Sequence, residues 1–448
     1  MNTERWLNKS RLQTGGRVSL AGLALWGVFL YATMPQPASA RGQKENNMET
    51  VSVRAFGAKG DGNTDDTAAF QKAVNASSDI FVPKGDYVIT GPINLEDNQK
   101  ITLSNAALLK FRSIEKGKAL FTIKSKSNIT IQGGQIDGEY DKNPTGTLGG
   151  IIIRGSSRHI TIKDMVIKNM PTNSEKHSLL GDGIYIGSAG ADATAKIFPS
   201  DILISGVSLE RNMRNNISVT GGRHIRITGC YFTGDPLSAA SVDLEPNTMD
   251  GDAEDVSIVG NSFEKANSGI DITKSAHAVV VSGNTIDSIT PAIKGSVGVH
   301  MGPKCYDITV TGNVITGAHE GIRVNGKNSV VTGNRIVNSE RGLWVEGEGQ
   351  VVTSNLIQGT TEIGMMLSVI GGNISNNIFR NCVTDEKVDP KYPTVIHVKN
   401  YANGVFSGNM VYDDRPTPPN IRGIVLPSDP NFAKTWKVSN NHVTNLRE

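Results

Sequence analysis

Apolar and polar residues alternate along most of the chain, and one alternating unit returns at short, nearly regular intervals. The unit places Gly, Ser or Asn before an Asn, with an apolar residue two positions later, as in TGNVI at 311–315 and TGNRI at 332–336. Its central Asn recurs at eight positions, which are Asn261, Asn284, Asn313, Asn334, Asn355, Asn377, Asn409 and Asn441. A chain that repeats itself in this way predicts a solenoid.

The shortest repeats contain 21 to 23 residues, which suits three short strands joined by three tight turns. The period of two excludes helical solenoids, and a β-propeller would need about four strands per 40–50 residues. We therefore predict an all-β fold, a right-handed parallel β-helix. The repeated Asn is expected to take the left-handed backbone of a turn. Its side-chain amides are expected to bond between coils ~4.8 Å apart.

A distinctive segment precedes the repeats. It reads VRAFGAKGDGNTDDTAAFQKAV from Val53 to Val74, and FVPKGDYVI follows at 81–89. This segment resembles the entry into the pectate-lyase-like β-helix superfamily, which includes polygalacturonase-related proteins and phage tailspike depolymerases. We expect Thr64 to Asp66 to cap a short helix that buries Phe70, Ala73 and Val74 and covers the open end of the first coil. Asp61, Asp65 and Asp66 are then cap and turn residues.

The first forty residues have the pattern of a secretory signal peptide. Four basic residues precede an uncharged apolar run from Val18 to Ala32, and Ala38-Ser39-Ala40 offers a cleavage site. The run is short for a membrane span, which needs about 20 residues, although an uncleaved anchor is the alternative. We predict a secreted or periplasmic protein with no membrane span in the mature chain. Residues 41–448 would form one β-helix domain, with the cap and first coil at 50–95 and the coils at 100–448.

The net charge and the cysteine content limit the kinds of partner and metal site that the sequence predicts. The net charge is +2, and the leader holds four basic residues and one acidic residue, so the remaining chain is near −1. A nucleic-acid or membrane surface is therefore not expected. Cys230, Cys305 and Cys382 show no metal-ligand spacing, and Cys230 is expected to be a buried apolar residue. No metal site or cofactor is predicted from these residues.

A second recurrent strand has apolar residues at its second and fourth positions, so its third residue should point outward. This outward column comprises Tyr185, Ser218, Asp243, Asp271, His300, Arg323, Trp344 and Met366. Glu245 shares its face. Polar insertions at 169–181, 187–201, 246–255 and 288–296 are expected to wall a groove between Asp182 and His300. Such a face suits a polysaccharide, possibly an acidic one.

Glycoside hydrolysis requires two carboxyl groups, about 5–5.5 Å apart for retention and about 6.5–9.5 Å for inversion. Asp243 and Asp271 occupy equivalent positions of successive coils, and Asp182 or Glu245 could complete the pair. Mutual repulsion would raise at least one of their pKa values and keep an acid protonated near neutrality. The alternative for each is a solvated or ion-paired surface carboxylate.

The resemblance to polygalacturonases is partial. Gly181-Asp182-Gly183-Ile184 resembles the Asn-Thr-Asp-Gly-Ile segment of that family and implies a catalytic role for Asp182. The next coil has Arg214-Asn215 in place of an Asp-Asp pair, and the one after has Ala239-Ala240-Ser241 in place of Gly-His-Gly. The run from Asp243 to Asn247 resembles an Asp-x-Glu-Pro-Asn pattern of bacterial β-helix proteins. That resemblance adds Arg214, Asn216 and Asn247 as candidate substrate-binding residues.

Two other functions remain open. A lyase acting on a uronic acid, or a C5-epimerase, would take a proton with Tyr185, His300, Lys274 or Arg323. Such a lyase would use Ca²⁺ held by Asp182, Asp243 and Asp271. A binding or assembly protein would instead stack Trp344 and Tyr185 on sugar rings. In either case His300, Arg323, Trp344 and Tyr185 are candidate substrate-binding residues.

Overall fold

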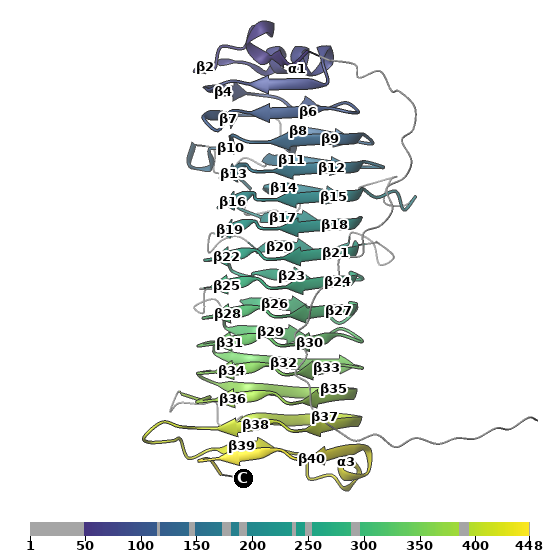
Figure 1. The fold of residues 1–448 in the computed structure, drawn as a ribbon, viewed down its shortest axis with the longest axis vertical. Coiled ribbons are helices and arrows are strands. Elements are labelled where there is room, and N and C mark those ends of the chain that lie inside the picture. The colour runs from purple at the N-terminus through teal and green to yellow at the C-terminus, as the bar shows by residue number, and fades with distance from the viewer. Residues whose placement is uncertain are drawn as a thin grey trace, which may run out of the picture. The chain divides into compact units, whose positions relative to one another are not determined.

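The computed structural model describes residues 49–113, 117–142, 148–172, 181–187, 195–234, 239–246, 253–287, 296–384 and 394–447. These residues wind into a stack of coils in which each described strand pairs in parallel with its equivalent in the next coil (Figure 1). Typical coils contain three strands, as predicted, so the fold is a right-handed parallel β-helix. The predicted signal peptide at 1–40 and Asn247 lie outside the described residues.

The strands fall into three sets, named by their order within a coil. The first strands are β5 Ile93–Asn94, β8 Lys118–Lys124, β11 Leu148–Arg154, β14 Ile184–Gly187, β17 Asn215–Val219, β20 Ala240–Leu244, β23 Ile270–Ile272, β26 Val297–Met301, β29 Glu320–Val324, β32 Arg341–Glu348, β35 Ile363–Ser375, β37 Thr394–Ser407 and β39 Arg422–Val425. The second strands are β1 Val51–Ser52, β3 Asp79–Val82, β6 Lys100–Leu103, β9 Ser127–Gln132, β12 Arg158–Lys163, β15 Ser200–Ser205, β18 Gly222–Thr228, β21 Ala253–Val259, β24 His277–Ser282, β27 Tyr306–Thr311, β30 Val330–Thr332, β33 Val351–Thr353 and β40 Trp436–Ser439. The third strands are β2 Asp61–Asp65, β4 Gly85–Ile89, β7 Ala107–Phe111, β10 Gln135–Asp137, β13 Val166–Lys168, β16 Ser208–Glu210, β19 Tyr231–Thr233, β22 Ser262–Glu264, β25 Thr285–Asp287, β28 Val314–Thr316, β31 Arg335–Val337, β34 Leu356–Gln358, β36 Ile378–Arg380, β38 Met410–Tyr412 and β41 His442–Thr444. The first and second strands belong to one sheet and the third strands to another.

The core lies inside the coils and is built by the period-two alternation. In β17, Ile217 and Val219 point inward and are fully buried. Each third strand after β2 supplies a central apolar residue, and two of these, Phe232 and Phe263, stack with ring centroids 4.6 Å apart. Cys230 is buried as predicted. The inward residues therefore form a continuous apolar column that holds successive coils in register.

The repeated Asn residues form a buried hydrogen-bonded ladder, which confirms half of their predicted role. The Asn334 amide donates to Asn355 Oδ1 at 3.0 Å, and Asn313 donates in turn to Asn334 Oδ1 at 2.9 Å. The predicted left-handed backbone of the Asn was wrong. The residue before each Asn takes that conformation instead, as Gly333 does with φ 64° and Ser354 with φ 57°. This leaves the Asn side chain free to point inward.

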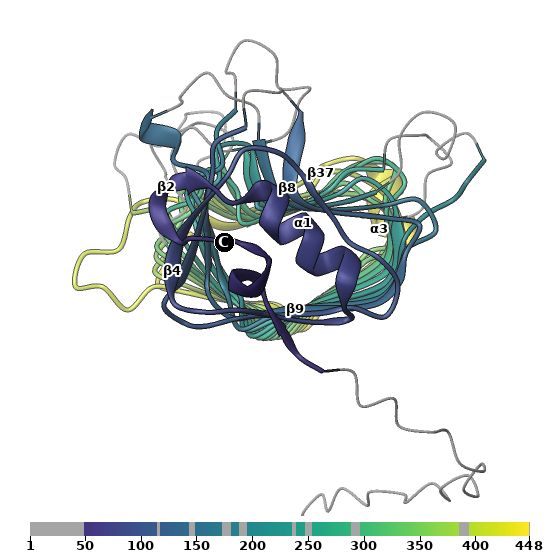
Figure 2. The same cartoon turned by 90° about the horizontal axis from the view of Figure 1, so that it is seen from above.

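Helix α1, Thr67–Ala76, lies over the end of the first coils (Figure 2). It buries Phe70, Ala73 and Val74 as predicted. Its capping matches the prediction in part. The Asp65 carboxylate accepts from the backbone N–H of Thr67 at 3.0 Å, whereas the Asp66 carboxylate accepts from the backbone N–H groups of Lys59 and Gly60 rather than from the helix. The short helices η1 Val53–Phe56, η2 Tyr140–Lys142 and α3 Pro430–Thr435 complete the described elements.

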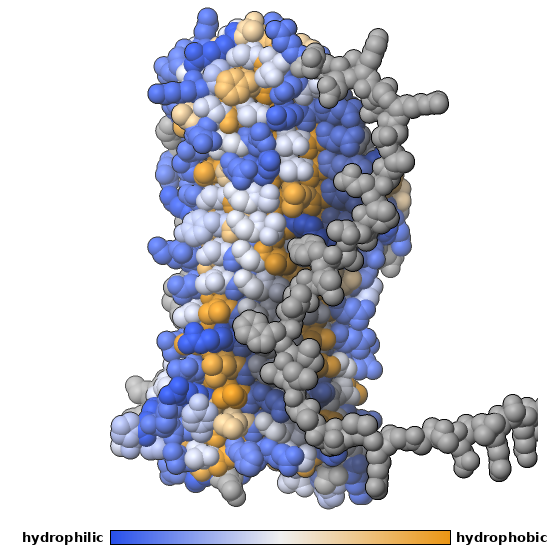
Figure 3. All heavy atoms as spheres, viewed as in Figure 1, coloured by the Kyte–Doolittle hydropathy of each residue, from blue (hydrophilic) through white to orange (hydrophobic). Residues whose placement is uncertain are grey.

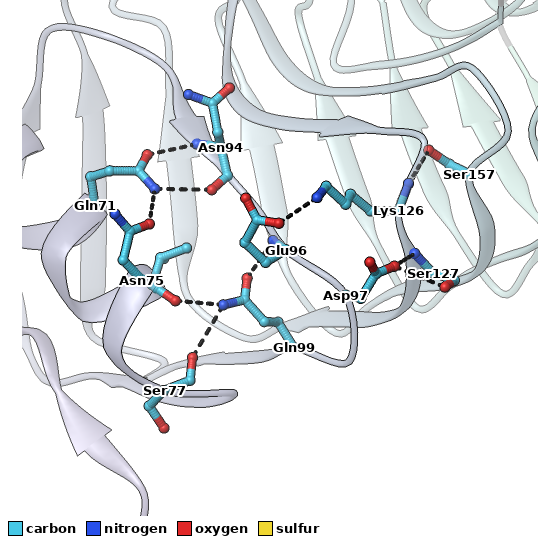
Figure 4. Close-up of polar contacts among 11 residues, drawn as sticks. Gln71, Asn75, Ser77, Asn94, Glu96, Asp97, Gln99, Lys126, Ser127 and Ser157 are labelled. Carbon is cyan, nitrogen blue, oxygen red and sulfur yellow. Dashed lines mark hydrogen bonds and ion pairs between the residues drawn. The ribbon is translucent and has the colours of Figure 1, made fainter.

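Hydrogen bonds of polar side chains connect α1 to the coils beneath it (Figure 4). Gln71 accepts from the Asn94 N–H and donates to its carbonyl at 3.0 Å. Gln99, which is buried, donates to the Val74 and Ser77 carbonyls at the end of the helix. The helix is thus bonded to the stack at its middle and at its C-terminal end, and it covers the end of the apolar column.

The outside of the stack of coils carries both hydrophilic and hydrophobic side chains. Figure 3 shows hydrophilic and hydrophobic residues interspersed on the face in view. Within the described part of the chain, no helix has the length and apolarity needed to cross a membrane.

Candidate functional site

The predicted outward column exists and is in register along the first strands. Tyr185 pairs with Ser218, Ser218 with Asp243, Asp243 with Asp271, and Asp271 with His300. The column continues through Arg323, Trp344 and Met366. Exposure varies along it, because Tyr185, Ser218 and Met366 are buried, whereas His300 and Asp271 remain part-exposed. The accessible part therefore begins at Asp243 and runs toward Trp344.

Asp243 lies at the boundary between the buried and the accessible parts. It is 9% exposed, and one carboxylate oxygen accepts a hydrogen bond from the Asn215 amide at 3.2 Å. Burial raises the pKa of Asp243 to about 8, with further contributions from the charges of Asp271 and Glu245. Arg214 opposes this rise. A carboxyl group in this state is a proton donor at neutral pH.

Asp271 follows Asp243 on the adjacent strand and contacts a histidine. His300 Nδ1 lies 2.7 Å from Asp271 Oδ1. The Asp271 side chain is 32% exposed and that of His300 is 26% exposed. The carboxylate orients the imidazole and leaves its Nε2 on the far side of the ring.

Asp182 is enclosed. Its side chain is fully buried, and it accepts from Arg214 at 3.1 Å and from the Ser218 hydroxyl at 2.9 Å. Burial raises the pKa of Asp182, and the Arg214 guanidinium and Ser218 hydroxyl oppose that rise. Asn215 donates to both Ser218 and Asp243, so a chain of hydrogen bonds links Asp182 to Asp243. Asp182 is placed to hold this network rather than to touch a substrate.

The remaining predicted residues have varied surroundings. Glu245 pairs with Lys274 at 3.0 Å, both side chains being 39% exposed. The Tyr185 hydroxyl accepts from Thr220 at 2.6 Å, and the Arg154 guanidinium lies over its ring. Asn216 bonds to Asn212 and to the Thr233 carbonyl, inside the turn region and away from the outward column.

A charged cluster that the sequence did not reveal lies beyond His300. Glu320 is 2% exposed and accepts from Arg323 at 3.3 Å and from Arg341 at 3.0 Å. Arg341 also pairs with Glu362 at 2.7 Å. Both guanidiniums lie over the Trp344 ring, 5.6 and 5.2 Å from its centroid. The only sequence signal for this cluster was that Glu320 and Arg341 occupy equivalent positions, three residues before the outward residue.

A cleft of about 640 Å³ adjoins this cluster. Its walls come from the ends of the first strands and the turns after them, and include Pro303, Asn325, Glu346, Val369 and Ile370. Lys327, also in the wall, pairs with Glu348 at 3.2 Å. The walls predicted from the four polar insertions fall largely outside the described residues, so the groove between Asp182 and His300 stays a prediction.

Metal-binding groups do not converge in the described ranges. Nowhere among the residues the structure describes do three His, Cys, Asp or Glu side chains lie close enough to share an ion. Cys230, Cys305 and Cys382 are buried and separate, and burial raises their thiol pKa values to between about 11 and about 12. These thiols are poor metal ligands as they stand.

Two family models match the chain. Residues 50–271 match "Rhamnogalacturonase A/epimerase, pectate lyase-like", and residues 213–410 match "Periplasmic copper-binding protein (NosD)". The second match lies over the repeated coils.

Similar proteins agree with the first model. The chain is 26% identical to the uncharacterized protein YclG of Bacillus subtilis, over 61% of this chain and 56% of that protein. It is 29% identical to an exopolygalacturonase of Arabidopsis thaliana, over 43% of this chain and 53% of that protein. The chain thus spans about half the length of these two curated relatives.

A solved structure agrees on the fold. The tailspike protein of E. coli bacteriophage HK620, in complex with a pentasaccharide, superposes with a TM-score of 0.58 at 13% identity, over 88% of this chain and 80% of that one. The coils, the N-terminal motif and these matches lead to one conclusion. The chain belongs to the pectate-lyase-like superfamily of right-handed parallel β-helix proteins.

Proposed function

We propose that the protein is an exported enzyme that hydrolyses glycosidic bonds of a polysaccharide at Asp243 and Asp271. One observation carries the proposal: a nearly buried carboxyl group, whose pKa is raised to about 8, lies in register beside a part-exposed carboxylate. Two carboxyl groups in different protonation states are what this reaction requires.

Each residue then has a distinct role. Asp243 donates its proton to the oxygen of the leaving sugar, and Asp271 acts from the same face of the sheet as nucleophile or base. Neighbouring strands are ~4.8 Å apart, which is closer to the carboxyl separation of retaining enzymes than to that of inverting ones. His300 orients Asp271 through the 2.7 Å contact. Asn215 and Ser218 link Asp243 to the buried pair of Asp182 and Arg214.

The test is incubation with a panel of neutral and acidic polysaccharides, with product analysis. Hydrolysis yields new reducing ends without ultraviolet-absorbing unsaturated sugars. Asp243→Asn and Asp271→Asn should each lower the rate by at least about a hundredfold. Asp287→Asn, an exposed acid on the third strand β25, is the matched control and should keep full activity. Binding without cleavage by the unmodified protein would contradict the proposal and favour a binding or assembly role.

The contact between His300 and Asp271 favours one second candidate, a lyase or C5-epimerase acting on a uronic acid. The carboxylate at Nδ1 orients the imidazole, and Nε2 could then take a proton from the sugar. Asp182, Asp243 and Asp271, all within the described ranges, do not form the three-ligand group predicted to hold Ca²⁺, so no metal step is assigned to this candidate. Unsaturated products in numbers equal to the new reducing ends would establish it.

A further inference from the structure

We propose that the outward face from Asp243 to Trp344 takes an uncharged sugar chain rather than a polyuronate, because carboxylates of the protein already neutralise the cations described along it. This inference rests on the proposed function and adds the substrate class. It concerns the side chains around Asp243, Asp271, His300, Arg323 and Trp344.

The two cations nearest the carboxyl pair are already engaged. Arg214 forms its ion pair with Asp182, which is fully buried, and only 17% of the arginine side chain is exposed. Lys274 pairs with Glu245 at 3.0 Å. The charge of each cation is therefore already balanced by a carboxylate of the protein, so a substrate carboxylate would gain little net attraction from either.

The cluster beyond His300 is also neutral as a unit. Glu320 and Glu362 supply two negative charges, and Arg323 and Arg341 supply two positive charges, with contacts between 2.7 and 3.3 Å. Glu320 is 2% exposed, so it cannot exchange its arginines for water. Displacing it with a ligand carboxylate would leave a buried, unpaired charge, which is strongly unfavourable.

The charges left over are acidic. Asp271 contacts only a histidine among the side chains with which it shares a described ion pair or hydrogen bond. In the adjoining cleft Lys327 is paired with Glu348, while Glu346 brings a further negative charge. A chain of uronates would meet a net negative potential here, and like charges reduce both affinity and association rate.

An uncharged sugar fits the same surface without breaking a pair. Its hydroxyl groups can donate to Asp271 and Glu245 and accept from Lys274, whose side chains are each at least 32% exposed. Val369, Ile370 and Pro303 give the cleft apolar contacts for ring faces. Placed polar groups among apolar walls are typical of sugar sites.

The experiment compares polygalacturonate with its carboxyl-reduced form, alongside a panel of neutral and acidic polysaccharides. Binding is measured by affinity electrophoresis and cleavage by new reducing ends. We expect the protein to bind and cleave neutral polymers and to bind polygalacturonate at least about tenfold more weakly than its reduced form. The preference should weaken as salt is added, since its origin is charge repulsion.

Two variants each remove the charge of a carboxylate that pairs with Arg323 or Arg341. Glu362→Gln and Glu320→Gln should each tighten binding of acidic polymers by about tenfold, the effect of ~1.4 kcal/mol, with little change for neutral ones. Glu362 is 36% exposed, so its variant should fold even where Glu320→Gln does not. Glu264→Gln on the third strand β22 changes the net charge equally and serves as the control, with no expected effect on either class.

The outcomes separate the two proposals. Preferred binding or hydrolysis of an acidic polymer by the unmodified protein overturns the neutral substrate class and leaves the hydrolase intact. Elimination products overturn both, because elimination requires a uronate. Failure to cleave any polymer, with neutral chains still bound, overturns the hydrolase and leaves the specificity of the face established.

Discussion

Asp243 and Asp271 occupy paired positions on the adjacent parallel strands β20 and β23, yet their surroundings differ. Asp243 is 9% exposed and accepts from Asn215, whereas the Asp271 side chain is 32% exposed and contacts His300. The β-helix therefore creates two carboxyl groups with separate roles from one repeated position. The difference comes from the adjoining coils, which place a buried amide on one side and an imidazole on the other.

The first prediction concerns stability against pH. The folded state raises the pKa of Asp243 from 3.8 to about 8, so it keeps a proton that the unfolded chain releases between these values. Stability is therefore highest below pH 4 for this group and declines as the pH rises toward 8. Asp243→Asn should remove that decline and raise the free energy of unfolding at pH 8 by about 1–3 kcal/mol. Denaturant unfolding at several pH values tests this, with Asp287→Asn expected to match the unmodified protein.

The second prediction concerns the rate against pH. Asp243 must be protonated to donate, so kcat/KM should fall as the pH rises through about 8. Glu245 contributes to the raised pKa through its charge, so Glu245→Gln should move this alkaline limb to lower pH. Glu264→Gln should leave the limb in place. A limb that does not move in Glu245→Gln would show that another group controls it.

The sequence predicted the repeated positions well, because the period of two and the Asn spacing fix the register of each coil. The outward column from Tyr185 to Met366 was predicted residue by residue on this basis. What the sequence could not indicate was which outward residues are buried. Asp182 lies against Arg214, 32 residues away, and that contact depends on two coils and the turns between them. Alternation determines which way a side chain points, but not what covers it.

The ladder of repeated Asn residues shows that the sequence pattern also leaves the backbone conformation of a turn undetermined. Asn was correctly predicted to bond from coil to coil, but the left-handed residue is the one before it, as at Gly333 and Ser354. A motif in which Gly and Asn are adjacent does not indicate which of them has the positive φ. The structure resolves this because the Asn amide must point inward to reach the next coil.

The third prediction tests the ladder. Asn334 is 1% exposed and donates to Asn355 and to the Val310 carbonyl, while accepting from Asn313. Asn334→Ala leaves these partners unsatisfied and should lower the free energy of unfolding by about 2–4 kcal/mol. Thr332→Ala, on the outside of the same coil, should cost less than about 1 kcal/mol. Similar losses in the two variants would mean that the ladder adds no stability.

The fourth prediction compares two glycines of one coil. A Cβ on Gly321 would lie 2.5 Å from Ile336 Cγ2 and 2.7 Å from the Gly342 carbonyl oxygen, so Gly321→Ala should cost at least about 3 kcal/mol. A Cβ on Gly333 meets nothing within 4 Å, and the cost of Gly333→Ala is confined to its φ of 64°. That cost should be about 1 kcal/mol, and Gly333→Asn should cost less. Thermal unfolding of the three variants ranks them directly.

The fifth prediction concerns the buried pair of Asp182 and Arg214. Arg214→Met leaves a fully buried carboxyl group without its cation and should lower the free energy of unfolding by about 3–5 kcal/mol. The double variant Asp182→Asn with Arg214→Met removes both charges, and it should recover much of that loss. Because Arg214 lowers the pKa of Asp243, removing it should also move the alkaline limb of kcat/KM to higher pH.

Paired measurements on these variants separate a structural role from a role in tuning the acid. With the single variant Asp182→Asn measured as well, the unfolding free energies give the strength of the ion pair through a double-mutant cycle. The pH profile of the double variant, which is expected to fold, reports the electrostatic effect on Asp243 alone. Asp182 also raises the pKa of Asp243 through its charge, so the double variant should show a smaller shift than Arg214→Met. An unchanged alkaline limb in both variants would limit Arg214 to stabilising the fold, and would leave burial and the charges of Asp271 and Glu245 as the causes of the raised pKa of Asp243.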